Sequence, residues 1–223
     1  MPFRRQLHLI CDTTTLLADD GRDRVRAAIE AGVDAVQIRD HAADARTMLA
    51  AAKRILPCAS SQRVVVIIND RADVALALLP TRRATPGGAL VPVGVHLGER
   101  SLPVDLVRRH LPLPLVGRSV HTVEDALQAA ADGADYVTFG HIFPSASHPD
   151  EPPVGLDRLR DVVTRIEAPV LAIGGIDATN AADVLATGAA GIAVISAILR
   201  ADDPGRATAE LRAILDAATS SRN

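Results

Sequence analysis

The sequence has few aromatic residues and little net charge. It contains no tryptophan, one tyrosine and three phenylalanines in 223 residues, and its formal net charge is −3. Proteins that bind single-stranded nucleic acid stack bases on aromatic side chains, and proteins that bind duplexes carry a basic surface. The composition favours neither, so we expect no nucleic-acid partner.

Cysteines and long apolar runs are also scarce. Cys11 and Cys58 are the two cysteines, which excludes a disulfide scaffold and suits a reducing compartment. The longest strongly apolar runs, such as Val64–Ile68, are much too short to span a bilayer. The first twelve residues lack the apolar stretch of a signal peptide. We therefore expect a cytoplasmic protein with no membrane partner.

Short apolar runs alternate with helical patterns along the chain. The runs lack the polar–apolar alternation of a half-exposed strand, which indicates strands buried on both faces. Apolar residues spaced i, i+3, i+4, i+7 lie between them, for example in residues 123–130 and 159–166. We expect strands at Leu7–Cys11, Ala35–Ile38, Val64–Ile68, Val93–Leu97, Leu115–Ser119, Tyr136–Phe139, Val170–Ile173 and Gly191–Ile195.

Eight strands, each followed by a helix, fit the length of the chain. This count predicts an α/β fold, a single (β/α)8 TIM barrel over residues 1–223, with the barrel core at about residues 6–218. A doubly wound open sheet is the alternative, because alternation does not show closure. Two Pro-rich loops stand out. Pro80–Pro92 would lie on the stability face, and Ser145–Pro153 on the catalytic face, where it could form a lid.

Polar residues gather where the expected strands end, which is where a barrel carries its active site. Of the seven histidines, four follow or end a strand, and His148 lies in the loop after the sixth strand. A single histidine there would most simply be a hydrogen-bonded structural side chain. Several at one rim favour a functional site. The four are His41, His96, His121 and His141.

The loops after the seventh and eighth strands predict a phosphate site. Gly174-Gly175 lets backbone N–H groups approach a phosphate closely, and Ile195-Ser196 follows the eighth strand. Lysine occurs once, as Lys53, so arginine and backbone groups must meet the charge. Carboxylates are sparse at these ends, Asp70 being the main candidate. We expect no metal held by the protein and no cofactor.

Six short motifs along the chain match a known pattern in order and spacing: Gln37-Ile38-Arg39, Ile68-Asn69-Asp70-Arg71, Gly94-Val95-His96-Leu97-Gly98, Asp135-Tyr136, Ala172-Ile173-Gly174-Gly175-Ile176 and Ile195-Ser196-Ala197-Ile198. With these residues the chain resembles the thiamine phosphate synthase superfamily over nearly its whole length. The resemblance implies a TIM barrel of thiamine biosynthesis that binds a small phosphorylated thiazole at the loops after strands seven and eight. The superfamily has two branches. The synthase couples a pyrimidine methyl diphosphate to a thiazole phosphate, and the thiazole tautomerase aromatises a thiazole carboxylate phosphate.

Several positions differ from the synthase pattern, among them two threonines that are Ser145 and Ser147 here. Two lysines of that pattern are His41 and His148 here, a magnesium-binding aspartate is Ser101, and a Gly-Pro is Gly140-His141. The segments Gly117–His121 and Phe139–His141 match the tautomerase pattern instead, whereas Gln37 and Asn69-Asp70 look synthase-like. Weighing the lost lysines most, we predict a thiazole tautomerase, an isomerase. The alternatives are a thiamine phosphate synthase that uses Mg²⁺ on Asp70, and an inert thiazole phosphate-binding or regulatory relative.

The resemblance implies a role for each matching residue. His121 would be the catalytic proton shuttle, because histidine exchanges protons near neutral pH. The phosphate would be held by Gly174, Gly175, Ile195 and Ser196. The remaining substrate contacts would come from Gln37, Arg39, His41, Asn69, Ser119, His141, Ser145, Ser147 and His148. The sequence leaves open whether the chain forms a homo-oligomer.

Overall fold

Eight parallel strands close into a barrel in the computed structural model, which describes residues 4–79, 91–145 and 151–220. Each strand pairs with its neighbours in chain order, and the last pairs with the first, Leu9 opposite Val194. The prediction of a barrel rather than an open sheet is confirmed. The strands are β1 (Gln6–Cys11), β2 (Ala35–Ile38), β3 (Val65–Asn69), β4 (Val93–Leu97), β5 (Val116–Val120), β6 (Tyr136–Gly140), β7 (Val170–Ile173) and β8 (Gly191–Val194).

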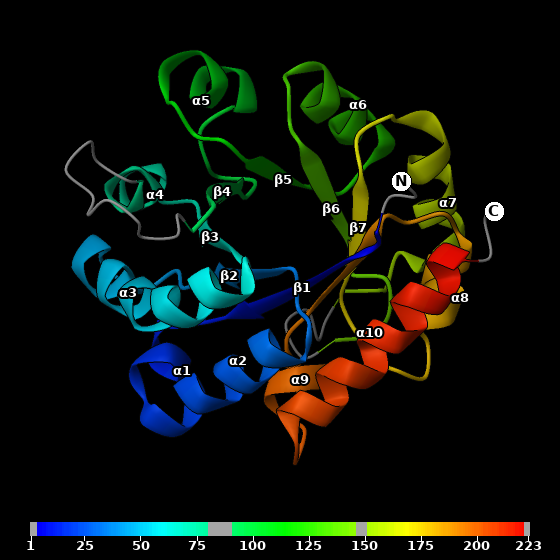
Figure 1. The fold of residues 1–223 in the computed structure, drawn as a ribbon. Coiled ribbons are helices and arrows are strands. Elements are labelled where there is room, and N and C mark those ends of the chain that lie inside the picture. Colours follow the sequence, from blue (N-terminus) through cyan, green and yellow to red (C-terminus); the bar gives the residue numbers. More distant parts are fainter. Residues whose placement is uncertain (1–3, 80–90, 146–150, 221–223) are drawn as a thin grey trace.

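Helices surround the barrel and follow one another around it in chain order (Figure 1). The ring closes where the last long helix packs against the second. The helices are α1 (Thr13–Leu17), α2 (Asp19–Ala31), α3 (Ala45–Gln62), α4 (Ala72–Leu78), α5 (Val104–His110), α6 (Val123–Ala131), α7 (Gly155–Arg165), α8 (Ala181–Ala186), α9 (Ser196–Leu199) and α10 (Pro204–Ser220). In the part of the chain that the structure describes, no helix is long and apolar enough to cross a bilayer.

The observed elements differ from the predicted ones in small ways. Every strand begins and ends within one residue of the prediction, as with Val65–Asn69 against the expected Val64–Ile68. The expectation of one helix per strand is wrong at two places, since β1 is followed by α1 and α2, and β8 by α9 and α10. The Pro80–Pro92 loop falls largely outside the described residues.

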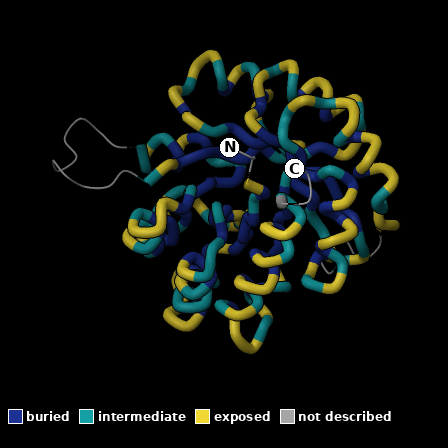
Figure 2. The backbone as a smooth tube through the Cα atoms, turned by 45° about the vertical axis from the view of Figure 1, so that its right-hand side comes forward, coloured by how far each residue is buried: buried dark blue, intermediate teal, exposed yellow. Residues whose placement is uncertain are grey.

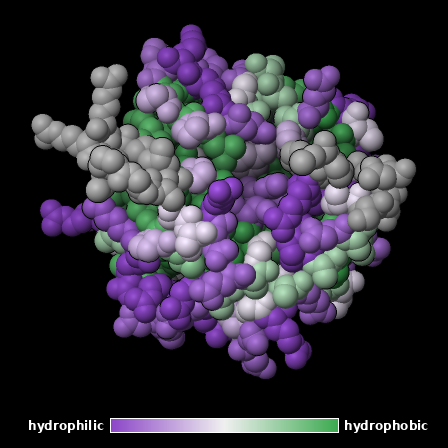
Figure 3. Space-filling view, in the orientation of Figure 1, coloured by the Kyte–Doolittle hydropathy of each residue, from purple (hydrophilic) through white to green (hydrophobic). Residues whose placement is uncertain are grey.

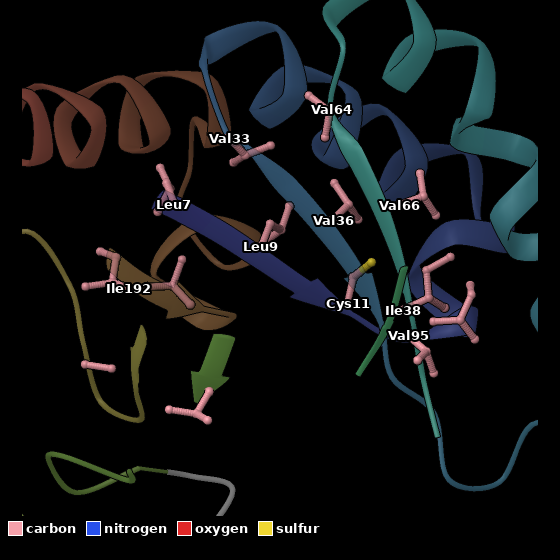
Figure 4. Close-up of a cluster of buried hydrophobic side chains, with 14 of the residues drawn as sticks. Leu7, Leu9, Cys11, Val33, Val36, Ile38, Val64, Val66, Val95 and Ile192 are labelled. Atoms are coloured by element: carbon pink, nitrogen blue, oxygen red, sulfur yellow. The ribbon is translucent and has the colours of Figure 1, made fainter. Parts of the chain in front are cut away.

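The main hydrophobic core lies between the outside of the barrel and the helices. Alternate residues of β1, Leu7, Leu9 and Cys11, point to this layer together with Val36 and Ile38 of β2 (Figure 4). The strands form the buried centre of the molecule, and the exposed positions lie on the outer sides of the helices (Figure 2). On the face seen in Figure 3, hydrophobic residues appear as small separate areas among hydrophilic ones.

The inside of the barrel is mainly apolar toward the amino ends of the strands. Ala35, Ile67, Tyr136 and Leu171 form a small separate cluster there. Toward the carboxyl ends of the strands the inward-facing side chains become polar, yet they remain buried. They are Gln37, Asn69, His96 and Thr138, whereas the buried His8 lies lower in the barrel, with its ring centroid 5.3 Å from that of Tyr136. Buried polar groups require hydrogen-bond partners, so this polar layer must be organised internally.

Candidate active site

A large cavity opens at the carboxyl ends of the strands. Its volume is about 1170 Å³, and residues from the ends of all eight strands or the loops that follow them line it, Ile10 of β1 included. Thirteen of the residues singled out above lie on its wall: Gln37, Arg39, His41, Asn69, Asp70, Ser119, His121, His141, Ser145, Gly174, Gly175, Ile195 and Ser196. Ser147 and His148 lie outside the described residues. The structure therefore brings the described candidates together around one space.

A chain of amide and carboxylate groups runs along one side of the cavity. The Nε2 of Gln37 donates to Oδ1 of Asn69 over 2.7 Å, and Nδ2 of Asn69 donates to Oδ2 of Asp70 over 2.7 Å. Gln37 and Asn69 are buried on the adjacent strands β2 and β3. Each amide is thereby held in one orientation before any ligand arrives, which favours selective binding.

Both oxygens of Asp70 accept hydrogen bonds from the protein. Oδ1 accepts from the backbone N–H of Gly98 over 2.8 Å and from the hydroxyl of Ser101. Oδ2 accepts from Asn69 and lies 3.7 Å from Nδ1 of His41. The carboxylate therefore ties the ends of β3 and β4 together.

The residues around Asp70 do not form a divalent metal site by themselves. Mg²⁺ takes octahedral oxygen coordination, typically one or two carboxylates with water and substrate phosphates. Here the second carboxylate of the synthase pattern is replaced by Ser101, which donates to Asp70 and so competes for an oxygen that a metal would need. Within residues 4–79, 91–145 and 151–220, no group of three or more His, Cys, Asp or Glu could hold a metal ion.

Arginines supply the positive charge of the cavity. Arg39, Arg100, Arg118 and Arg200 reach its wall from four different loops or strands. None of them forms an ion pair with a carboxylate among the described residues, and Arg118 donates to the carbonyl of Gly98 over 2.8 Å. Lys53 lies in α3 and does not line the cavity. Guanidinium groups bind phosphate oxygens bidentately, so these residues fit an anionic ligand.

Three of these four arginines were missed as site residues. Arg118 lies on β5 beside Ser119, so its place at a strand end was a usable signal. Arg100 and Arg200 are more distant from the strand ends, and the sequence gives no comparable indication for them. Their approach to the cavity depends on how the loops fold back.

A cluster of mostly buried side chains links β4, β5 and β6, and its members His96, Ser119 and Thr138 line the cavity. Nδ1 of His96 lies 3.0 Å from the hydroxyl of Tyr136, and Nε2 lies 2.9 Å from Oγ of Ser119. Burial lowers the pKa of His96 to about 3, and burial lowers the pKa of His8 to about 4. Both rings are therefore neutral at pH 7. Tyr136 was not predicted as part of a site, because a single aromatic residue at the start of a strand indicates only a core position.

His141 contacts the backbone of the loop that follows β6. Its Nε2 donates to the carbonyl oxygens of Glu151, at 3.2 Å, and Pro152, at 3.1 Å. This ring nitrogen therefore anchors the polypeptide on the far side of residues 146–150, and a substrate contact by His141 stays a prediction. Ser145 lines the cavity, and its Oγ is buried with no hydrogen-bond partner among the described residues. A substrate contact by Ser145 stays a prediction.

Gly174 and Gly175 begin the loop after β7, where its backbone packs closely against the loop after β6. Their φ angles are +96° and +64°, in the left-handed region that favours glycine. A Cβ at Gly174 would lie 2.4 Å from Cβ of His141, and one at Gly175 would lie 2.5 Å from the carbonyl oxygen of Pro144. Another residue at either position would displace this segment, whose backbone N–H groups are the predicted phosphate donors. Ile195 and Ser196 face the same space from the end of β8.

His121 is exposed at the cavity rim, directly after β5 and one residue before Thr122, which caps α6. This position allows contact with a ligand, and that contact stays a prediction.

A polar, arginine-lined cavity at the carboxyl ends of the strands is typical of the enzymes of the (β/α)8-barrel class. The comparisons with known proteins narrow this class. Residues 7–198 match the model of a family described as "Thiamine monophosphate synthase", and the chain belongs to this family.

Named relatives cover most of the chain. A thiamine-phosphate synthase of Roseiflexus castenholzii is 45% identical over 198 residues, 88% of this chain and 80% of that protein. One of Chloroflexus aurantiacus is 39% identical over 94% of this chain and 92% of that protein. The structure of the thiamine phosphate pyrophosphorylase of Pyrococcus furiosus has a TM-score of 0.81 and 35% identity, covering 97% of this chain and 98% of that one.

These relatives overturn the predicted branch. The prediction of a thiazole tautomerase, an isomerase, is wrong, because relatives at 35–45% identity over most of the chain are named synthases. The two histidines in place of lysines carried too much weight in that prediction. The absence of the two lysines suggested a cavity with too little positive charge. The arginines that line the cavity provide positive charge instead.

Proposed function

We propose that this chain is a thiamine phosphate synthase, a transferase that couples a pyrimidine methyl diphosphate to a thiazole phosphate and releases diphosphate. Its 45% identity to a named thiamine-phosphate synthase across 88% of the chain is the observation that carries the proposal. The size of the cavity and its four arginines support it, because two phosphorylated molecules must bind side by side.

In the proposed reaction the lone pair of the thiazole nitrogen forms a C–N bond to the methylene carbon of the pyrimidine. The C–O bond between that carbon and the diphosphate breaks, and both of its electrons leave with the diphosphate. Arg39, Arg100 and Arg118 lie where they could offset the charge that develops on the leaving group. Such fixed charges lower the barrier because they need no rearrangement during the reaction.

The thiazole phosphate would bind at the other side of the cavity. The backbone N–H groups of Gly174 and Gly175, with Ile195, Ser196 and the unpartnered hydroxyl of Ser145, would hold its phosphate. Gln37 and Asn69, held by their mutual hydrogen bond, and His41, His121 and His141 would contact the remaining parts of the two substrates.

The test is a coupling assay with the purified protein. Pyrimidine methyl diphosphate and thiazole phosphate are mixed with the enzyme and Mg²⁺, and thiamine phosphate and diphosphate are measured by chromatography. Equal amounts of both products are expected, with neither product when one substrate is omitted. Tight binding of thiazole phosphate without either product would contradict the proposal and favour an inert binding protein.

The Ser101 position yields a prediction about metal binding. Ser101→Asp would place a second carboxylate beside Asp70, which supplies the kind of ligand pair that Mg²⁺ uses. Without metal we expect a lower melting temperature, because two close carboxylates repel each other. With about 10 mM Mg²⁺ and a Kd of about 1 mM, we expect a gain of about 1.4 kcal/mol, or about 4 °C.

The measurement is thermal unfolding of the substrate-free protein with and without Mg²⁺. The unaltered protein should show no such rise, and Ser101→Ala is the matched control that removes the hydroxyl without adding a charge. An equal rise in the unaltered protein would show that the residues around Asp70 already bind the metal.

A further inference from the structure

Three buried side chains connect the lower barrel to the cavity wall. The hydroxyl of Tyr136 lies 3.0 Å from Nδ1 of His96, and Nε2 of His96 lies 2.9 Å from Oγ of Ser119. Oγ1 of Thr138 lies 3.3 Å from both Nε2 of His96 and Oγ of Ser119. Tyr136, His96 and Thr138 are buried and Ser119 is partly exposed, and of these four Tyr136 alone does not line the cavity.

The strand register brings these groups together. His96 lies opposite Gly117, and Gly117 lies opposite Tyr136, so the three occupy one row across β4, β5 and β6. A Cβ at Gly117 would lie 2.2 Å from the Tyr136 ring. The glycine therefore makes the space through which the phenol reaches His96.

The direction of the first hydrogen bond follows from the partners that are present. Burial raises the pKa of Tyr136, so the phenol keeps its hydrogen. Among the described residues, Nδ1 of His96 is the one hydrogen-bond partner of that hydroxyl. A buried O–H group requires an acceptor, so Tyr136 donates and Nδ1 accepts. The ring of His96 is neutral, and its single hydrogen must then be on Nε2.

The number of hydrogens in the group decides whether the hydroxyl of Ser119 donates or accepts a hydrogen bond on its cavity side. With Nε2 protonated, His96 donates to Oγ of Ser119, so the hydrogen of Ser119 cannot go to the histidine. That hydrogen points to the cavity when the hydroxyl of Thr138, 3.3 Å away, donates to Ser119 rather than accepting from it. An anionic oxygen in the cavity favours this arrangement, because it is a stronger acceptor than a neutral hydroxyl. With the other tautomer, Ser119 would donate inward to Nε2 and present only lone pairs to a ligand.

We propose that Tyr136 and His96 are positioning residues that fix the hydroxyl of Ser119 as a hydrogen-bond donor to an anionic oxygen of the diphosphate group. The inference rests on the proposed function for the identity of the ligand. A donor suits a phosphoryl oxygen, whereas a serine presenting lone pairs would repel it. The hydroxyl of Tyr136 thus fixes the tautomer of His96. That tautomer in turn decides whether the hydroxyl of Ser119 presents a hydrogen or a lone pair to the negative charge of the substrate.

The tautomer can be measured directly, without substrate. In protein labelled with ¹⁵N-histidine, the resonances of His96 are assigned by their loss in His96→Gln. We expect a protonated Nε2 and a bare Nδ1 in the unaltered protein, and a loss of this preference in Tyr136→Phe, which removes only the hydroxyl. A protonated Nδ1 in the unaltered protein would overturn the proposal irrespective of the enzyme's activity.

The consequence for binding is tested by titration calorimetry with inorganic diphosphate. We expect Tyr136→Phe and Ser119→Ala each to weaken binding by about 10-fold, the usual effect of one hydrogen bond to a charged group. The double variant Tyr136→Phe, Ser119→Ala should also bind diphosphate about 10-fold more weakly, and not about 100-fold. Tyr136 acts through Ser119, so both substitutions remove the same hydrogen bond to the ligand. Thr187→Val is the matched control, since it removes another buried hydroxyl that lies away from the cavity.

The outcomes separate the proposal from the proposed function. Unchanged binding in Tyr136→Phe, or a loss of about 100-fold in the double variant, would overturn the role of the phenol. The expected tautomer in a protein that does not bind diphosphate would overturn the ligand assignment and count against the synthase function as well. The expected tautomer together with non-additive losses supports both.

Discussion

Replacing Gly174 with alanine is expected to lower kcat/KM for coupling by about 100-fold or more. Gly174 has a φ of +96°, and a Cβ there would lie 2.4 Å from Cβ and 2.5 Å from Cα of His141. Neither atom is the end of a flexible side chain, so the loop after β7 must move. A shift of this segment would remove the backbone donors proposed for the phosphate, and losing two hydrogen bonds to a charged group amounts to about 3 kcal/mol or more.

Gly155→Ala is the matched control for this prediction. Gly155 also has a left-handed φ, +77°, but a Cβ added there would meet nothing within 4 Å. Both variants therefore introduce the backbone strain of alanine in this region, at about 1–2 kcal/mol, and only Gly174→Ala adds a clash. Thermal unfolding should show a loss of stability in both variants. Steady-state kinetics should show a loss of activity in Gly174→Ala alone. Equal activity in the two variants would refute the proposed phosphate site.

The barrel and the location of its site could be predicted from the sequence. Strands buried on both faces appear as short apolar runs such as Val93–Leu97, and all eight were within one residue of the observed bounds. Since parallel strands carry their carboxyl ends to one side, residues as distant as Gln37 and Gly174 could be assigned to one cavity.

The hydrogen bonds inside the barrel could not be predicted. In a strand buried on both faces, the sequence does not distinguish residues that point inward, such as His96, from those that pack on the helices, such as Leu97. The partners of Tyr136 depend on the register between three strands and on the small size of Gly117. Long-range pairings of this kind are visible only once the barrel is closed.

The branch of the family was mispredicted because substitutions were interpreted one position at a time. His41 in place of a lysine suggested a weaker site for diphosphate. In the fold, the charge of a site is the sum over all side chains that reach it, and Arg118 and Arg200 contribute from elements distant in the sequence. A lost charge at one position therefore says little about the reaction until the cavity is known.

The largest effect on stability is expected from Arg212→Met. Arg212 of α10 is buried, and its Nη1 pairs with Oδ2 of Asp34 over 2.9 Å while Nη2 donates to the carbonyl oxygen of Arg5 over 2.8 Å. Oδ2 of Asp34 also accepts from the backbone N–H of Leu7 over 2.8 Å. Removing the guanidinium leaves a poorly exposed carboxylate whose remaining cation is the largely exposed Arg4, with Nη1 at 3.2 Å from Oδ1. Breaking a buried pair in this way costs about 3–5 kcal/mol.

The expected loss lies near the lower end of that range, because Nε of Arg212 is buried without a partner among the described residues and its removal relieves a cost. A loss of about 3 kcal/mol would lower the melting temperature by about 6–12 °C for a chain of this size. Arg165→Met is the control, since Arg165 forms an exposed pair with Asp161 at 2.9 Å, and such pairs contribute about 1 kcal/mol or less. Denaturant unfolding of the double variant Asp34→Asn, Arg212→Met should recover part of the loss, because it also removes the poorly exposed negative charge that Arg212 neutralised. A double variant less stable than Arg212→Met would show that Asp34 stabilises the barrel through Leu7 rather than through the arginine.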